Sequence, residues 1–153
     1  MDFQHSERAQ KVMAQVERFV RERVVPNEQT YIDQLVDSDD WREWRIPPIV
    51  EELKAEAKDL GLWNLFLPDE EYGAGLDNRD YAPIAEITGP SFLAPEVLNC
   101  NAPDTGNAEV LVKYGSDEQK EQWLRPLLDG KIRSAFAMTE PAVASSDATN
   151  MQA

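Results

Sequence analysis

Apolar residues recur at helical spacing along the first part of the chain. Between residues 6 and 24 they return every three or four positions, and charged residues occupy the other faces. Ser6 is a natural N-cap, and Pro26 is expected to close the segment. We therefore predict an amphipathic helix over residues 6–24. Its apolar positions are Ala9, Val12, Met13, Val16, Phe19, Val20 and Val24.

Two more helices are predicted between residues 27 and 61. The stretch 27–44 favours a helix followed by an acidic turn. The stretch 47–61 favours a helix because it has proline in its first turn and Gly61 as a C-cap. The core candidates of these two segments, together with two later tryptophans, are Tyr31, Leu35, Trp41, Trp44, Ile49, Leu53, Ala57, Leu60, Trp63 and Trp123.

Shorter helices are predicted after a loop with two glycines at residues 69–78. They cover residues 79–88, a short helix or turn within 91–101, and a segment that has its N-cap at 105–107 and ends at Gly115. Ser116 and Gln119 stand at capping-box spacing and predict the start of another helix. Pro126 removes a backbone donor, so it is expected to break or kink that helix and leave residues 127–129 as a separate turn.

The period changes at residue 131. Ile132, Ser134, Phe136 and Met138 alternate with smaller or charged residues up to residue 138, which is the pattern of a β-strand. A single strand cannot satisfy its own backbone groups. We therefore predict a mainly α fold, with a helical domain over residues 1–130 and the beginning of an incomplete β domain over residues 131–153. The chain is expected to be a fragment of a longer protein.

Composition narrows the possible partners. The formal net charge is −14, from 29 acidic and 15 basic residues, which disfavours nucleic acid as a partner. The single cysteine, Cys100, is expected to be a packing residue, and one cysteine with one histidine, His5, argues against a metal site. No signal peptide and no apolar run of membrane-spanning length is visible, so no membrane association and a cytoplasmic location are expected.

Four stretches in a fixed order resemble one enzyme family. They are "LPDEEYGAG", "YAPIAEITG", "NAPDTGNAEVLVKYGSDEQKEQWLRPLLDGKIRSAFAMTEP" and "ASSDATN". From about residue 51 to the end, the chain resembles the N-terminal part of the flavin-dependent acyl-CoA dehydrogenases. That resemblance implies FAD as cofactor, an acyl-CoA thioester as substrate, and α,β-dehydrogenation by α-proton abstraction and hydride transfer to flavin N5. It also implies an electron-transfer flavoprotein as acceptor and a homodimer or homotetramer.

The resemblance also implies site residues. Phe136, Met138 and Thr139 match positions that line the flavin, and Ser145 and Ser146 match the segment that holds the FAD pyrophosphate. Ser146 precedes Asp147 as the family's serine does, so it is the expected substrate contact as well. The loop is one residue longer than the common pattern, and the serine assignment depends on that alignment. The family's catalytic base lies in a later domain, so no catalytic residue is expected in this chain, Glu140 included.

Other interpretations stay open on the sequence alone. An acyl-CoA oxidase or a related flavin monooxygenase of the same fold would share these motifs. A non-catalytic helical interaction module would explain the helices without a role for the Thr-Glu-Pro loop. Residues 101–107 could border an acyl pocket or simply cap a helix.

Overall fold

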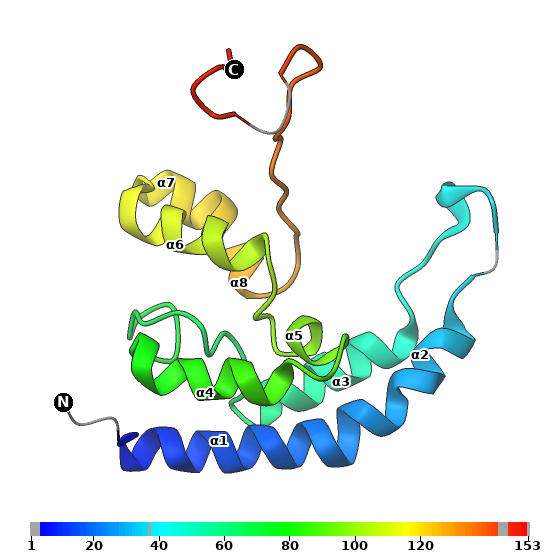
Figure 1. Ribbon diagram of the computed structural model, residues 1–153, viewed down its shortest axis with the longest axis vertical. Coiled ribbons are helices and arrows are strands. Elements are labelled where there is room, and N and C mark those ends of the chain that lie inside the picture. Colours follow the sequence, from blue (N-terminus) through cyan, green and yellow to red (C-terminus); the bar gives the residue numbers. More distant parts are fainter. Residues whose placement is uncertain (1–3, 37, 144–146, 153) are drawn as a thin grey trace.

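The computed structural model describes residues 4–36, 38–143 and 147–152. Helices account for its regular structure, and the described residues contain no β-strand. Figure 1 shows α1 along one edge, α3 and α4 beside it, α6 to α8 as a second group, and residues 131–143 leaving the helices. The helices are α1 (Glu7–Phe19), α2 (Glu28–Gln34), α3 (Pro48–Asp59), α4 (Asn78–Thr88), α5 (Ala94–Val97), α6 (Asp104–Tyr114), α7 (Asp117–Gln119) and α8 (Arg125–Leu128). The mainly α fold is confirmed.

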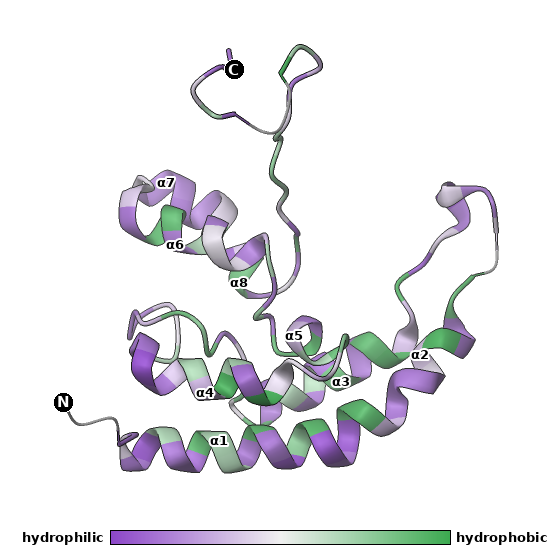
Figure 2. Ribbon diagram, viewed as in Figure 1, coloured by the Kyte–Doolittle hydropathy of each residue, from purple (hydrophilic) through white to green (hydrophobic). Residues whose placement is uncertain are grey.

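Two apolar clusters form the core. The larger one joins α1, α3, α4 and α5, and its most buried members include Val16, Leu53 and Ile84. The smaller one joins α6 and α8 to the loop at residues 66–67. Cys100 and Tyr81 pack against both clusters, so the predicted packing role of Cys100 is confirmed. Polar and apolar residues alternate along α1 in Figure 2, as its sequence pattern requires.

Local signals predicted several helix ends correctly. The Ser6 hydroxyl accepts a hydrogen bond from the Ala9 N–H at 3.0 Å and caps α1. Ser116 and Gln119 form the predicted capping box at α7. Gly61 has a φ of 70° directly after α3 and its C-cap, Leu60, as a C-terminal glycine should. The N-cap predicted at residues 105–107 is wrong, because α6 already begins at Asp104 and has no side-chain cap.

Neither predicted proline break occurs as expected. Residues 20–24 form a π turn and residues 25–27 a 3₁₀ turn, so the chain stays helical through Pro26 into α2. Residues 120–124 form a second π turn, and Pro126 lies in the first turn of α8. A proline is tolerated in the first turn of a helix, where its missing N–H is not needed. In both places a π turn precedes the proline, so the helical hydrogen-bond pattern changes before the proline and the chain stays helical through it.

Some predicted core residues are exposed. The chain between α2 and α3 projects away from the other helices (Figure 1), so Trp41 and Trp44 are 69% and 62% exposed. Leu35 and Leu60 lie just beyond the ends of α2 and α3, and Trp123 lies on the second π turn. Trp63 packs against the larger cluster as predicted. Leu35 and Leu60 are the C-cap residues of their helices, whereas Trp41, Trp44 and Trp123 were expected in the core as large apolar side chains and lie on turns.

The predicted strand is also absent. Residues 133–140 have no regular secondary structure, and in the described part of the chain no backbone hydrogen bond from another segment reaches residues 135–139. A strand needs a neighbour that satisfies its N–H and C=O groups, and the described residues offer none. The alternation survives only as far as residue 134, where Ile132 and Ser134 are half-buried and Arg133 is more exposed.

Leu53 and Leu60 provide a matched test of this core. Leu53 is fully buried in the larger cluster, so Leu53→Ala should destabilise the chain by about 2–5 kcal/mol. Leu60 is 49% exposed, so Leu60→Ala should change stability by less than about 1 kcal/mol. Urea denaturation followed by circular dichroism measures both. Equal losses would contradict the assignment of Leu60 to the surface.

Asp80 ties α4 to the start of α1. Its carboxylate accepts hydrogen bonds from the Ser6 hydroxyl at 2.6 Å and the Ser6 N–H at 3.2 Å, and these bonds lower the pKa of Asp80. A lowered folded-state pKa means that the carboxylate stabilises the fold at neutral pH and loses this effect as the pH falls below 3.8.

Asp80→Ala should therefore lower the urea midpoint at pH 7, and the difference from the original chain should shrink as the pH drops below 3.8. Asp39→Ala, in the exposed loop before α3, is the control and should have little effect at either pH. A difference for Asp80→Ala that does not depend on pH would rule out the charge as its cause.

Candidate functional site

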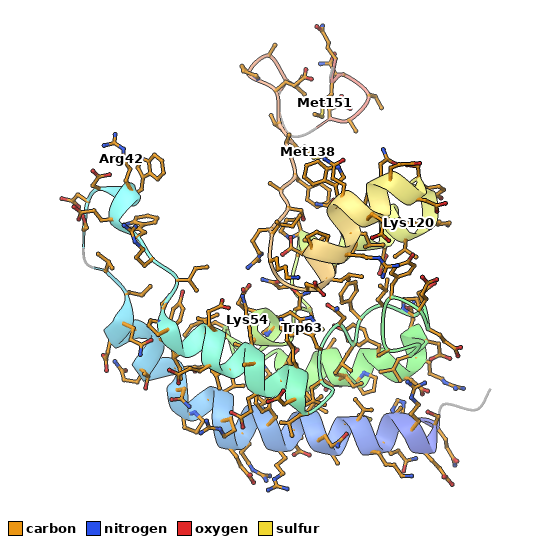
Figure 3. All side chains as sticks on the ribbon, turned by 180° about the vertical axis from the view of Figure 1, so that it is seen from behind. Arg42, Lys54, Trp63, Lys120, Met138 and Met151 are labelled. Atoms are coloured by element: carbon orange, nitrogen blue, oxygen red, sulfur yellow. The ribbon has the colours of Figure 1, made fainter. Side chains whose placement is uncertain are left out.

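The predicted flavin-lining residues lie on the segment that leaves the helices. Phe136 is 66% exposed, Met138 is 52% exposed, and Thr139 is exposed as well. Figure 3 shows Met138 on this segment, apart from Lys54 on α3 and from Trp63 in the loop that follows α3. Phe136, Met138 and Thr139 thus lie close together in sequence on an exposed segment, and no other described residues cover them. Ser145 and Ser146 lie outside the described residues.

A buried carboxylate holds the start of that segment. Asp104, the first residue of α6, is 3% exposed. Its Oδ1 accepts hydrogen bonds from the Ser134 N–H at 2.8 Å and the Ser134 hydroxyl at 2.6 Å, and its Oδ2 accepts one from Arg133 Nε at 2.6 Å. Asn107, one turn along α6, donates to the Ser134 hydroxyl oxygen at 2.8 Å. Four hydrogen bonds therefore fix residues 133 and 134 to the N-terminal end of α6.

Arg133 continues this arrangement to two other helices. Its Nη1 lies 2.6 Å from Glu96 Oε1 on α5, and the same oxygen lies 2.7 Å from Lys54 Nζ on α3. The other oxygen of Glu96 accepts a hydrogen bond from the Asn101 side chain at 2.7 Å. We call Lys54, Glu96, Asp104, Arg133 and Ser134 the anchor cluster. Through it, α3, α5 and α6 all hold the same short piece of chain.

The anchor cluster is arranged to stay ionised. Burial opposes ionisation of Asp104, but its hydrogen bonds from Ser134, and then the charge of Arg133, hold the pKa of Asp104 below its ordinary value. For Glu96 burial acts in the same way and is outweighed by Lys54 and Arg133, so its pKa is lowered too. The pKa of Arg133 is raised by these carboxylates despite its own burial. Both acids and Arg133 are therefore charged at neutral pH.

Two cavities border the anchor cluster. The larger, of about 770 Å³, lies under the loop before α3 and beside α5, and its polar lining includes Glu96, Asn101 and Arg133 together with Ser38 and Arg45 of that loop. The smaller, of about 480 Å³, lies between α6, Trp123 and residues 132–135. Asn101 lines the first and Asn107 the second, and neither caps a helix. The same stretch contains the start of α6, whose N-cap is Pro103, so both alternatives for residues 101–107 stay predictions.

The sequence matches a family of known proteins over most of its length. The pattern described as "Acyl-CoA dehydrogenase, N-terminal domain" covers residues 6–131, which include every helix of the structure. The chain belongs to the acyl-CoA dehydrogenase family. The resemblance in the sequence is thus confirmed, and the helices are those of the family's N-terminal domain.

Individual relatives agree with this membership. The chain is 54% identical over 159 residues to "Probable acyl-CoA dehydrogenase FadE2" of Mycobacterium tuberculosis, covering 99% of this chain and 37% of that protein. It is 53% identical over 151 residues to "Acyl-CoA dehydrogenase family member 11" of Gallus gallus, covering 98% of this chain and 19% of that protein. A solved structure described as "Structure of a putative acyl-CoA dehydrogenase from Mycobacterium abscessus" superposes with a TM-score of 0.88 at 55% identity, covering 97% of this chain and 38% of that one. The chain spans about a fifth to two fifths of the length of these relatives.

The anchor cluster was missed by the sequence analysis. Asp104 and Ser134 are 30 residues apart, and no local pattern connects them. The one available signal was a set of charged residues at positions that the helical period assigns to the inside. Lys54 follows Leu53 on α3, and Asp104 stands one turn before the buried Ala108 on α6. Charges at such positions require partners, and those partners are the remaining members of the cluster.

Other kinds of site find no support in the described residues. Within residues 4–36, 38–143 and 147–152, no group of three or more His, Cys, Asp and Glu side chains could hold a metal ion. Over the same residues, no helix combines the length and apolarity needed to cross a membrane. Glu140 accepts a hydrogen bond from the Gln152 N–H at 3.0 Å.

Proposed function

We propose that this chain is the N-terminal part of an FAD-dependent acyl-CoA dehydrogenase. Residues 1–130 would form its helical domain and residues 131–153 the beginning of a middle β domain. The observation that carries the proposal is 54% identity along nearly the whole chain to a protein named as an acyl-CoA dehydrogenase. The reaction would be α,β-dehydrogenation of an acyl-CoA thioester. An electron-transfer flavoprotein would be the acceptor, and the assembly a homodimer or homotetramer.

The exposed segment fits a flavin in its chemistry. Thr139 has an N–H and a hydroxyl that can donate to the polar edge of the ring, and Phe136 and Met138 expose apolar side chains that can cover a flat ring. Ser145 and Ser146 would supply hydroxyls for the pyrophosphate, and Ser146 would also contact the substrate. When bound, FAD supplies the hydride-accepting chemistry. The role of this chain is to bind and orient, since no residue here is proposed as the catalytic base.

The full reading frame that contains these residues provides the test. Its purified product should carry FAD, and an acyl-CoA added without oxygen should bleach the visible flavin absorbance. A series of acyl chain lengths would identify the preferred substrate. Protein that neither contains nor binds FAD would contradict the proposal. Hydrogen peroxide production matching substrate turnover in air would replace the dehydrogenase with an oxidase.

Thr139→Val in that longer protein should weaken FAD binding by roughly fivefold and change the flavin absorption spectrum, because one hydrogen bond contributes about 1 kcal/mol. The substitution keeps the β-branched shape and removes only the hydroxyl. Equilibrium dialysis and visible absorption measure the two effects. Thr30→Val, on α2, makes the same chemical change far along the chain and should leave both unchanged. An unaltered spectrum and affinity for Thr139→Val would remove Thr139 from the site.

A further inference from the structure

The segment that leaves the helices has two parts: residues 131–134 are bonded to the helical domain, and residues 135–139 are exposed. The N–H groups of Lys131 and Ile132 bond to the Pro126 carbonyl oxygen at 2.9 and 3.4 Å, and Ile132 packs against the smaller cluster. Arg133 and Ser134 are bound by Asp104. From residue 135 to residue 139 all side chains are exposed. Ser134 is therefore the last residue of the segment that is hydrogen-bonded to the helices before the exposed residues begin.

We propose that Asp104 is a positioning residue, which fixes the place and direction in which residues 135–139 leave the helical domain and so sets how Phe136 and Thr139 meet the flavin. The inference rests on the proposed function, because it assumes that these residues contact FAD. It assigns to Asp104 no contact with cofactor or substrate. Asp104 acts through Ser134 and Arg133.

The geometry of the carboxylate supports this role. Oδ1 holds both the backbone and the side chain of Ser134, while Oδ2 holds Arg133, so two successive residues are fixed by one buried group. Phe136 follows Ser134 by two residues, which is at most about 7 Å of extended chain. A change in the orientation of Ser134 would therefore move the point from which the chain reaches Phe136. Arg133 is constrained from a second side as well, because Glu96 on α5 also forms an ion pair with it.

Stability alone does not account for this cluster. Ion pairs are weak contributors to folding free energy. Desolvation of Asp104 offsets much of its attraction to Arg133, and solvent screens Arg133, whose side chain is 47% exposed. An apolar contact at the same place would hold the chain without defining its rotation. Directional hydrogen bonds to the N–H and hydroxyl of one residue define it. The cluster therefore suits orientation better than it suits stabilisation.

The test uses the full-length flavin-loaded protein and two variants of different severity. Asp104→Asn removes the charge and replaces one acceptor oxygen with a donor. Ser134→Ala removes only a hydroxyl, and it keeps the test valid if Asp104→Asn fails to fold. The control is Glu56→Gln, which weakens an exposed ion pair with Arg23 that joins α3 to the π turn after α1.

We expect Asp104→Asn to weaken FAD binding about tenfold and Ser134→Ala about threefold. Both should alter the visible circular dichroism of the bound flavin, which reports its surroundings, and lower kcat more than they raise KM. Glu56→Gln should leave the affinity, the spectrum and both kinetic constants unchanged.

A lower melting temperature with unchanged flavin affinity and circular dichroism would show a merely structural role and overturn the inference. Unchanged behaviour of Ser134→Ala and Asp104→Asn would overturn it as well. If the unsubstituted protein binds no FAD, the proposed function itself has failed. A flavin-binding protein with silent variants would leave that function intact and refute only the role of Asp104.

Discussion

The buried carboxylate of Asp104 constrains how the helices connect to the segment that follows them. A desolvated charge is tolerated only where hydrogen bonds replace its water, and three donors from Arg133 and Ser134 do so here. Removing one donor would leave the charge partly unsatisfied, so the positions of both residues are tightly coupled to α6. Glu96 and Lys54 extend the same constraint to α5 and α3. The exit of the chain is thus set by three helices that are distant in sequence.

The course of the chain from α8 to Arg133 depends on how α8 packs against the loop after α3. The π turn at residues 120–124 lets the chain remain helical up to Pro126 and Leu128. The Leu128 carbonyl oxygen then accepts hydrogen bonds from Trp63 Nε1 at 2.6 Å and Asn64 Nδ2 at 2.9 Å. Gly130 follows with a φ of 72°, and a β-carbon there would lie 2.9 Å from the Trp63 ring. A glycine is therefore required where the chain turns past Trp63 toward Arg133.

Sequence reasoning succeeded where the cause is local and failed where it is not. The apolar stripe of α1, the cap at Ser6 and the capping box at Ser116 depend on residues a few positions apart, and all three were predicted. Leu60 was misplaced because periodicity does not show which turn of a helix loses its neighbours, and Trp41 and Trp123 because a large apolar side chain does not reveal its own burial. The predicted site residues came from resemblance to a family, not from any physical pattern. The bonds from Asp104 to Ser134 span 30 residues, and only the fold brings the two together.

The charge balance of the anchor cluster bears on what the surrounding surface can accept. The chain as a whole carries a formal charge of −14, which repels anions. Within the cluster, the acids Asp104 and Glu96 are paired with the bases Arg133 and Lys54, and Lys54 also lies 3.4 Å from the exposed Glu51. A phosphate-bearing ligand of the kind proposed here would meet less repulsion from these two paired acids than from unpaired ones. The ion pairs of the anchor cluster would therefore have two effects: they would fix the direction of the segment, and they would reduce the contribution of Asp104 and Glu96 to a field that opposes such a ligand.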